Sequence, residues 1–172
     1  MARAVISTIG RDRPGIVNDL SETIARLHLN IEDSRMAVLG GEFAVLMSVS
    51  GDAAALAELD RRLAEFARAA DFAYLYRPTE ARTPAPNLPF EVRVVAMDHP
   101  GIVHGIAGFF SSRNINIRDL ETESEHAAHT GTPIFNLTMT VEVPARTRIG
   151  QLRAEFETYC DEQGLDGTLA SA

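Results

Sequence analysis

The chain has 172 residues, of which 45% are hydrophobic and 23% charged, so it can form packed cores and is not extensively disordered. Its net charge of -8 argues against direct nucleic-acid binding, which normally requires a basic surface that neutralises phosphates. All 16 basic residues are arginines. The absence of lysine excludes Schiff-base enzymes, lysine-bound pyridoxal enzymes and P-loop nucleotide-binding proteins.

No apolar run approaches the roughly 20 residues of a membrane helix, and the first residues contain no signal-peptide core. The single cysteine, Cys160, cannot form an internal disulfide. We therefore expect a cytoplasmic protein that does not associate with membranes.

The chain contains an internal repeat. Residues 12–17 (DRPGIV) recur 86 positions later as residues 98–103 (DHPGIV), and residues 30–33 (NIED) recur at the same offset as 116–119 (NIRD). After six additional residues in the second copy, the segment 43–47 aligns with 135–139. Order and spacing persist over about 40 residues, which indicates a tandem duplication.

Hydrophobic periodicity predicts the elements in chain order. The first copy predicts an N-terminal strand, a helix over 16–27, strands at 31–38 and 43–47, a helix over 56–66 capped by Asp52, and a strand at 72–77. The second copy predicts strands at 90–96, 117–124 and 135–141, helices over 102–110 and 149–159, and a weak strand at 165–169.

This order predicts two α+β domains of the ferredoxin-like type, each a four-stranded antiparallel sheet with both helices on one face. We expect the domains at residues 1–78 and 90–172. The segment 79–89 between them is rich in proline, and half of the eight prolines lie within residues 78–89. It therefore predicts an extended linker.

The most strongly repeated segment is the turn into the first helix of each copy. A glycine at the helix start leaves main-chain N–H groups uncovered, and together with the helix dipole they form a seat for a carboxylate. The aspartate just upstream offers an acceptor for an ammonium group, and the asparagine that opens the second strand offers an amide. If these groups lie near one another, they suit a zwitterionic amino acid. The same aspartate also fits a helix cap and the same asparagine a turn, so the residues alone leave both interpretations open.

At these residues the chain resembles the ACT domain, a small regulatory module that binds amino acids, over roughly residues 4–77 and 90–169. Two such domains in tandem resemble the family of the glycine cleavage system transcriptional repressor. The resemblance implies a ligand site at the loop before the first helix and at the start of the second strand, usually at an interface between two ACT sheets. Carried over by position, it singles out Asp12, Gly15, Ile16, Asn30, Asp98, Gly101, Ile102 and Asn116.

ACT domains that bind amino acids often carry a polar residue two positions before the first of these site residues. This chain has Gly10 and Ala96 at those two positions. The resemblance further implies that transcription is controlled through contact with a separate DNA-binding activator.

We therefore expect a non-enzymatic regulatory protein that senses a small, glycine-like amino acid and controls transcription of amino-acid metabolism through such a protein partner. We expect a homodimer without cofactor and without direct nucleic-acid contact. One alternative is a scaffold whose ACT domains bind no ligand and act only in protein recognition. Another is a relative of the ACT segment that precedes a deformylase domain, although the chain leaves no room for that catalytic domain.

Two further groups of residues invite a chemical role. Five potential metal ligands gather where the second copy has its insertion, but their surroundings favour a surface loop over a metal site; they are Glu121, Glu123, Glu125, His126 and His129. Cys160 lies on an apolar helical stripe with no histidine close in sequence, which favours a buried structural thiol over a nucleophile.

Overall fold

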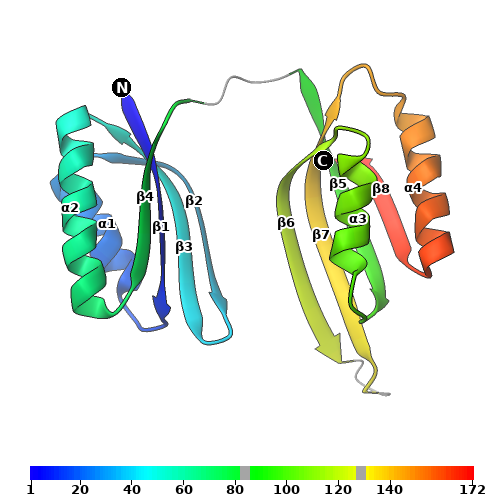
Figure 1. The fold of residues 1–172 in the computed structure, drawn as a ribbon, viewed down its shortest axis with the longest axis horizontal. Helices are drawn as coiled ribbons and strands as arrows, with labels where there is room; N and C mark the ends of the chain where they lie inside the picture. Colours follow the sequence, from blue (N-terminus) through cyan, green and yellow to red (C-terminus); the bar gives the residue numbers. More distant parts are fainter. Residues whose placement is uncertain (82–85, 127–130) are drawn as a thin grey trace. The chain divides into compact units, whose positions relative to one another are not determined.

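The computed structural model describes residues 1–81, 86–126 and 131–172. The chain divides into two compact units, residues 1–83 and 84–172, which we call the first and second domains (Figure 1). Residues 82–85 of the predicted linker and residues 127–130, which include His129, lie outside the described residues.

The first domain has the order βαββαβ (Figure 1). Its sheet has the strand order β2-β3-β1-β4, and all neighbouring strands are antiparallel. The elements are β1 (Ala2–Arg11), α1 (Ile16–Arg26), β2 (Asn30–Leu39), β3 (Glu42–Gly51), α2 (Ala53–Ala70) and β4 (Ala73–Thr79).

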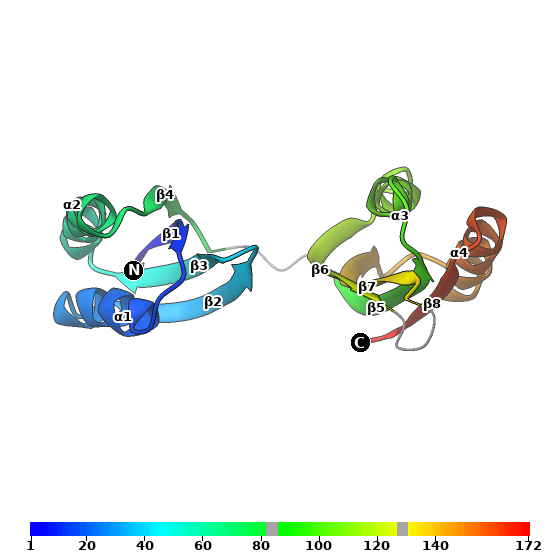
Figure 2. The same cartoon turned by 90° about the horizontal axis from the view of Figure 1, so that it is seen from below.

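The second domain repeats this architecture with the strand order β6-β7-β5-β8. Its elements are β5 (Asn87–Met97), α3 (Ile102–Ser111), β6 (Asn116–His126), β7 (Pro133–Pro144), α4 (Ile149–Gln163) and β8 (Asp166–Ser171). In each domain the two helices cover one face of the sheet, and Figure 2 shows α1 and α2 as one layer beside the sheet of the first domain.

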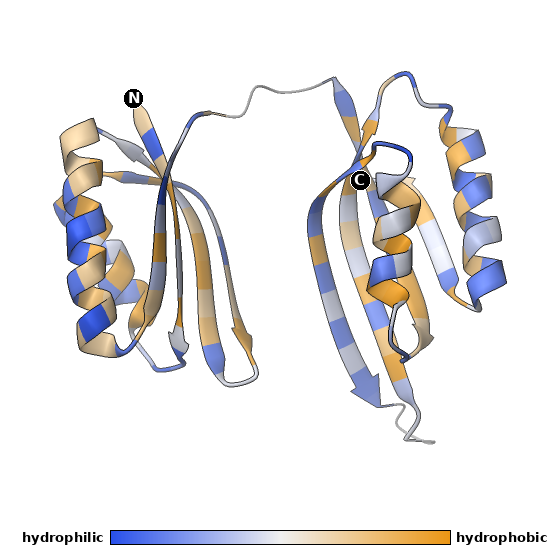
Figure 3. Cartoon of the chain, viewed as in Figure 1, coloured by the Kyte–Doolittle hydropathy of each residue, from blue (hydrophilic) through white to orange (hydrophobic). Residues whose placement is uncertain are grey.

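Alternation of residues along the strands produces the two cores. In β1 the helix-facing side chains Ala4 and Ile6 are buried, while their neighbours point to the other face of the sheet. The apolar stripes of the helices pack against the helix-facing side of each sheet and complete the core, with Leu20 and Ile24 on α1 and Phe110 on α3. Figure 3 shows the resulting alternation of hydropathy along the strands.

Local signals set the bounds of two helices, and the cap at Asp52 is the one that the sequence predicts. Asp52 caps α2, and its carboxylate accepts a hydrogen bond of 2.9 Å from the Ala54 amide. Gly164 ends α4 in the left-handed conformation, with φ of 68°. In the described ranges no helix is both long enough and apolar enough to span a membrane.

The strand β5 starts earlier than the proline content suggests. Asn87, Leu88 and Pro89 already pair with β7, so the end of the predicted linker is strand. The missing amide hydrogen of Pro89 is tolerated because the pairing of β5 with β8 begins only at Phe90. The carbonyl oxygen of Pro89 accepts a hydrogen bond from the amide of Ala172.

Candidate functional site

Both first helices begin at a glycine in the left-handed conformation. Gly15 precedes α1 with φ of 92°, and Gly101 precedes α3 with φ of 102°. Neither helix start has a side-chain cap. The first-turn amides of a helix have no partner within the helix, so each start offers N–H groups and the positive end of the helix dipole. We call these two helix starts the first and second mouths.

The first mouth is partly occupied by its own charged side chains. The guanidinium of Arg13 forms an ion pair of 2.8 Å with Asp19 in the first turn of α1 and donates a second hydrogen bond to the Pro14 carbonyl. The same guanidinium is the nearest group to the space above Gly15, at 3.8 Å from where a Cβ would lie. Asp12 is exposed, and its amide bonds to the carbonyl of Gly41.

The second mouth is more open. A Cβ built on Gly101 would meet no atom within 4 Å, and the first turn of α3 has no acidic residue. The carboxylate of Asp98 accepts a hydrogen bond of 3.0 Å from the Ser124 hydroxyl on β6, which orients it. The first domain has Val38 at the position of Ser124, so Asp12 lacks this support.

The isoleucines of the repeated motif serve the cores. Ile16 is 2% exposed and Ile102 5% exposed, and each packs beneath its helix start. Their side chains therefore fix the position of the helix, whereas their backbone amides belong to the mouth. A ligand at either mouth would contact the main chain of these residues.

The structure does not bring the asparagines to the mouths of their own domains. Asn30 pairs with Ser50, which pairs with Arg3 at the start of β1, whereas Asp12 follows the far end of that strand. Asn116 lies in the same way beside Glu142 and Pro89, at the end of the second sheet remote from Asp98. Within one domain the aspartate and the asparagine therefore do not lie near one another.

At that remote end both asparagines donate hydrogen bonds to carboxylates. The Asn30 amide donates to Glu32 at 3.2 Å, and the Asn116 amide donates to Glu142 at 3.0 Å. Hydrogen bonds from the Ser50 hydroxyl and from Asn30 lower the pKa of Glu32. The reason for the separation is topological, since β1 and β2 run in the same direction, so the start of β2 lies at the same end of the sheet as the start of β1 and remote from the end of β1.

The position two residues before Asp12 has no room for a side chain. A Cβ on Gly10 would lie 2.6–2.9 Å from the ring of Phe72, which is buried in the core. Two residues earlier on the same face, Thr8 has a buried hydroxyl that lacks a hydrogen-bond partner among the described residues. Val94 occupies the same position in the second domain, so the two domains differ in polarity beneath the helix layer.

The acidic residues of β6 do not converge. Glu121, Glu123 and Glu125 are exposed on one face of this edge strand, and the alternation of the strand places His126 on the other. Within the part of the chain that the structure describes, no three histidine, cysteine, aspartate or glutamate side chains are placed to hold a metal ion.

Cys160 lies on α4 inside the second core and is 1% exposed. Burial raises its pKa to about 11, with smaller contributions from nearby carboxylates. The neutral thiol therefore stabilises the folded state below the ordinary thiol pKa of about 8.5, and this stabilisation is lost as the pH rises towards 11.

We expect iodoacetamide at pH 8 to modify Cys160 at least tenfold more slowly in the folded protein than in guanidinium chloride, because the reactive thiolate is both disfavoured and covered. Mass spectrometry of quenched samples measures the two rates. Equal rates would show that α4 opens readily and that Cys160 is not a core residue.

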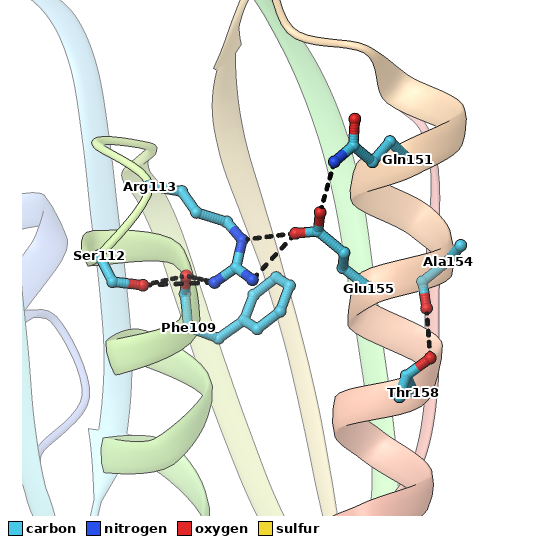
Figure 4. Close-up of polar contacts among 7 residues, drawn as sticks. All are labelled: Phe109, Ser112, Arg113, Gln151, Ala154, Glu155 and Thr158. Atoms are coloured by element: carbon cyan, nitrogen blue, oxygen red, sulfur yellow. Dashed lines mark hydrogen bonds and ion pairs between the residues drawn. The ribbon is translucent and has the colours of Figure 1, made fainter.

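A groove of about 740 Å³ lies between α3 and α4 of the second domain (Figure 4). Its floor includes Phe109 and Tyr159. Arg113 bridges the helices, because its guanidinium lies 3.8 Å from the centre of the Phe109 ring and donates two hydrogen bonds, of 2.9 and 3.0 Å, to Glu155. Hydrogen bonds from Gln151 and from Arg113 lower the pKa of Glu155.

None of the sequence patterns described above predicts this groove, although the repeat contains its signal. Gly105 and Gly108 of α3 line the groove, and the duplicated positions in α1 are Asp19 and Glu22. A Cβ on Gly105 would collide with the Tyr159 hydroxyl, whereas one on Gly108 would meet open space. The loss of two charged side chains from one copy of a duplicated helix therefore indicates an apolar groove.

Models of the ACT domain match both halves of the chain, over residues 2–74 and 90–161. The chain belongs to the ACT-domain family. The repeat seen in the sequence is thus a tandem pair of ACT domains, and the four-stranded sheets with two helices each are those of this family.

Relatives with the same tandem arrangement match almost the whole chain. The glycine cleavage system transcriptional repressor of Escherichia coli K12 is 29% identical over 96% of this chain and 87% of its own length. A crystal structure of an unknown protein from Galdieria sulphuraria is 30% identical, with a TM-score of 0.84 over 99% of this chain and 98% of that one. A second crystal structure, provisionally assigned as a glycine cleavage system transcriptional repressor, is 26% identical, with a TM-score of 0.76 over 99% and 97% of the two chains. These similarities support a regulatory role for this tandem ACT protein.

Proposed function

We propose that this tandem ACT protein senses a small amino acid and controls transcription through a protein partner. The observation that carries the proposal is the repeated, uncapped helix start at Gly15 and Gly101, each preceded by an exposed aspartate. Main-chain N–H groups at such a start accept a carboxylate, and the aspartate accepts hydrogen bonds from an ammonium group. Similarity to a transcriptional repressor supports the regulatory part.

The second mouth is the better candidate for a tight ligand. Ser124 orients Asp98, and a Cβ built on Gly101 would meet no atom within 4 Å, whereas the Arg13 guanidinium lies 3.8 Å from a Cβ built on Gly15 and pairs with Asp19 in the first turn of α1. A ligand carboxylate entering the first mouth would have to displace Arg13 from its ion pair with Asp19 or lie beside that pair. We therefore propose that Asp98, Gly101 and the amide of Ile102 bind the ligand more strongly than Asp12, Gly15 and the amide of Ile16.

Asn30 and Asn116 would take part only if another ACT domain supplied them. An ACT domain placed antiparallel against the edge strand β2 or β6 would bring its own asparagine to the end of the sheet where the mouth lies, because the two edge strands would then run in opposite directions. Ligand binding would then favour one association of ACT domains. A partner protein that recognises this association would respond to the amino acid by population shift.

The test is a thermal-shift screen of the full chain with glycine, serine and the other common amino acids. At one hundred times its Kd, a ligand should stabilise the folded state by about 2.7 kcal/mol. Asp98→Asn should weaken that ligand at least tenfold, because a charge-assisted hydrogen bond is lost, while the matched variant Asp12→Asn should have a smaller effect. If no amino acid raises the melting temperature of the wild type, the sensing role fails.

A scaffold without ligand is the second candidate. The observation that favours it is that each asparagine is remote from the mouth of its own domain and already bonded to a carboxylate. A scaffold would give no shift with any amino acid, yet it would still bind the partner that controls transcription. Once a partner has been captured with the full chain, its binding measured with and without amino acids separates the two functions.

A further inference from the structure

The first sheet has a face without helices, and that face is apolar at its centre. It carries Leu46 in β3, Ile9 in β1 and Leu75 in β4, which are 48%, 49% and 63% exposed. The register places Leu46, Ser7 and Leu75 in one row, which Arg35 of β2 begins, and in the next row Ile9 is flanked by alanines. We call this face the open face. It consists of the outward side chains of residues 5, 7, 9 and 11 in β1 and of their cross-strand neighbours in the other strands. Exposed apolar surface of this kind marks an interaction site.

The fold does not require this apolar character. The second domain has the same topology, and at the duplicated positions it carries Thr138 for Leu46, Thr168 for Leu75 and Arg93 for Ser7. Because the second sheet forms with polar residues there, the leucines of the first sheet are not needed for folding. They therefore point to contact with another molecule.

The charges of the open face are arranged so that the face is complementary to itself. One row across the sheet begins with Asp33 in β2 and ends with Arg77 in β4, on opposite edges. Near the end of the central strands, Arg11 in β1 lies opposite Glu42 in β3. A two-fold axis parallel to the strands and between β1 and β3 places β2 over the partner's β4 and β1 over the partner's β3.

In that arrangement two pairs of opposite charges meet, while Arg35, which pairs with Asp33 of its own chain, faces the partner's Leu75. Asp33 faces the partner's Arg77, and Arg11 faces the partner's Glu42. Sizes also match, since Leu46 faces the partner's Ser7 and Ala44 faces the partner's Ile9. Two sheets stacked with their strands nearly aligned, about 10 Å apart, form the ordinary sheet-on-sheet packing of proteins.

We propose that the open face of the first domain binds the open face of a second copy of this chain, forming a two-fold symmetric dimer. The contact is isologous, so it closes as a dimer and does not extend into fibres. The helices α1 and α2, and the start of α1 at the first mouth, lie on the opposite face of this sheet, which leaves them accessible (Figure 1). The proposal is therefore independent of amino-acid sensing and can succeed or fail without it.

The test uses full-length variants with reversed charges at the two ends of the row, Asp33→Arg and Arg77→Glu. In each single variant like charges face one another twice, so we expect the dimer Kd to rise at least tenfold, as measured by light scattering and native mass spectrometry. Mixing the two single variants should give a heterodimer, because each new charge then meets its opposite. The double variant should dimerise like the wild type. Arg61→Glu on the exposed surface of α2, where the side chain is 70% exposed, is the matched control and should remain dimeric.

Circular dichroism confirms that each variant is folded, which matters because Asp33 also pairs with Arg35 at 2.8 Å. A wild type that stays monomeric at micromolar concentration overturns the proposal, and so does a dimer that both single variants leave intact. A third outcome is that Arg77→Glu weakens self-association, Asp33→Arg strengthens it, and a mixture of the two single variants forms no heterodimer. In that case the open face binds an acidic surface instead of its own copy. A monomer that sediments with anionic lipid vesicles would assign the face to a membrane.

Discussion

Replacing Phe110 with alanine is expected to lower the free energy of unfolding of the second domain by about 3–5 kcal/mol. Phe110 is completely buried, and its ring packs at 5.1 Å from that of Phe109 and at 5.4 Å from that of Phe156. Truncation to alanine removes this apolar contact and leaves a cavity that the surrounding strands can only partly close. The loss is large against the roughly 5–15 kcal/mol of a whole native protein.

The repeat supplies a matched control, because Ile24 occupies the same position in α1 and is 1% exposed. Ile24→Ala should lower the stability of the first domain by about 2–5 kcal/mol. Hydrogen exchange measured by mass spectrometry assigns the loss of protection to peptides of one domain. Each variant should affect its own domain, since the chain divides into two separate cores. Equal loss of protection in both domains would show that they unfold as one unit.

Gly10→Ala is expected to destabilise the first domain by about 1–3 kcal/mol, because the new methyl group would overlap the ring of Phe72. The ring cannot move away freely, since it is buried and packs against Phe66 at 5.7 Å between ring centres. Phe72→Leu in the same chain should recover part of the loss, which a double-mutant cycle measures as a coupling between the two positions. Chemical denaturation of the four proteins gives the required free energies.

Gly108→Ala is the control for this substitution. It makes the same chemical change within α3, where the added Cβ meets open space, and should stabilise the second domain by up to about 1 kcal/mol through helix propensity. A neutral Gly10→Ala would mean that the space before Asp12 is available to a larger residue. A polar residue at this position, which ACT domains that bind amino acids often have, would then be compatible with this chain after all.

The fold could be predicted from the sequence because most of the patterns that indicate a strand or a helix occur in both copies of the repeat. The strict alternation of Phe135, Leu137 and Met139 predicts β7, and the apolar spacing that includes Leu20 and Ile24 predicts α1. Element boundaries were less certain, as the early start of β5 at Asn87 shows. Proline is a poor strand former on average, but at the end of a strand its effect depends on which neighbour would have used the missing N–H group.

The candidate site was harder to predict from the sequence, because it depends on distances between residues that local sequence patterns do not contain. Asp12 and Asn30 are close in sequence and recur together, yet the crossover through α1 carries the chain back to the opposite end of the sheet. The parallel direction of β1 and β2, which the predicted topology already contained, would have revealed this separation. The occupation of the first mouth by Arg13 could not be predicted, since it depends on the side-chain conformation that pairs Arg13 with Asp19.

The packing of Tyr159 gives the second domain an optical reporter of its own. The sequence has no tryptophan and three tyrosines, of which Tyr159 alone belongs to the second domain. Its hydroxyl fits over Gly105, and its ring lies 5.3 Å from that of Phe109. In a variant in which phenylalanine replaces Tyr74 and Tyr76, the remaining tyrosine emission would follow unfolding of this domain, and any molecule entering between α3 and α4, without an attached dye.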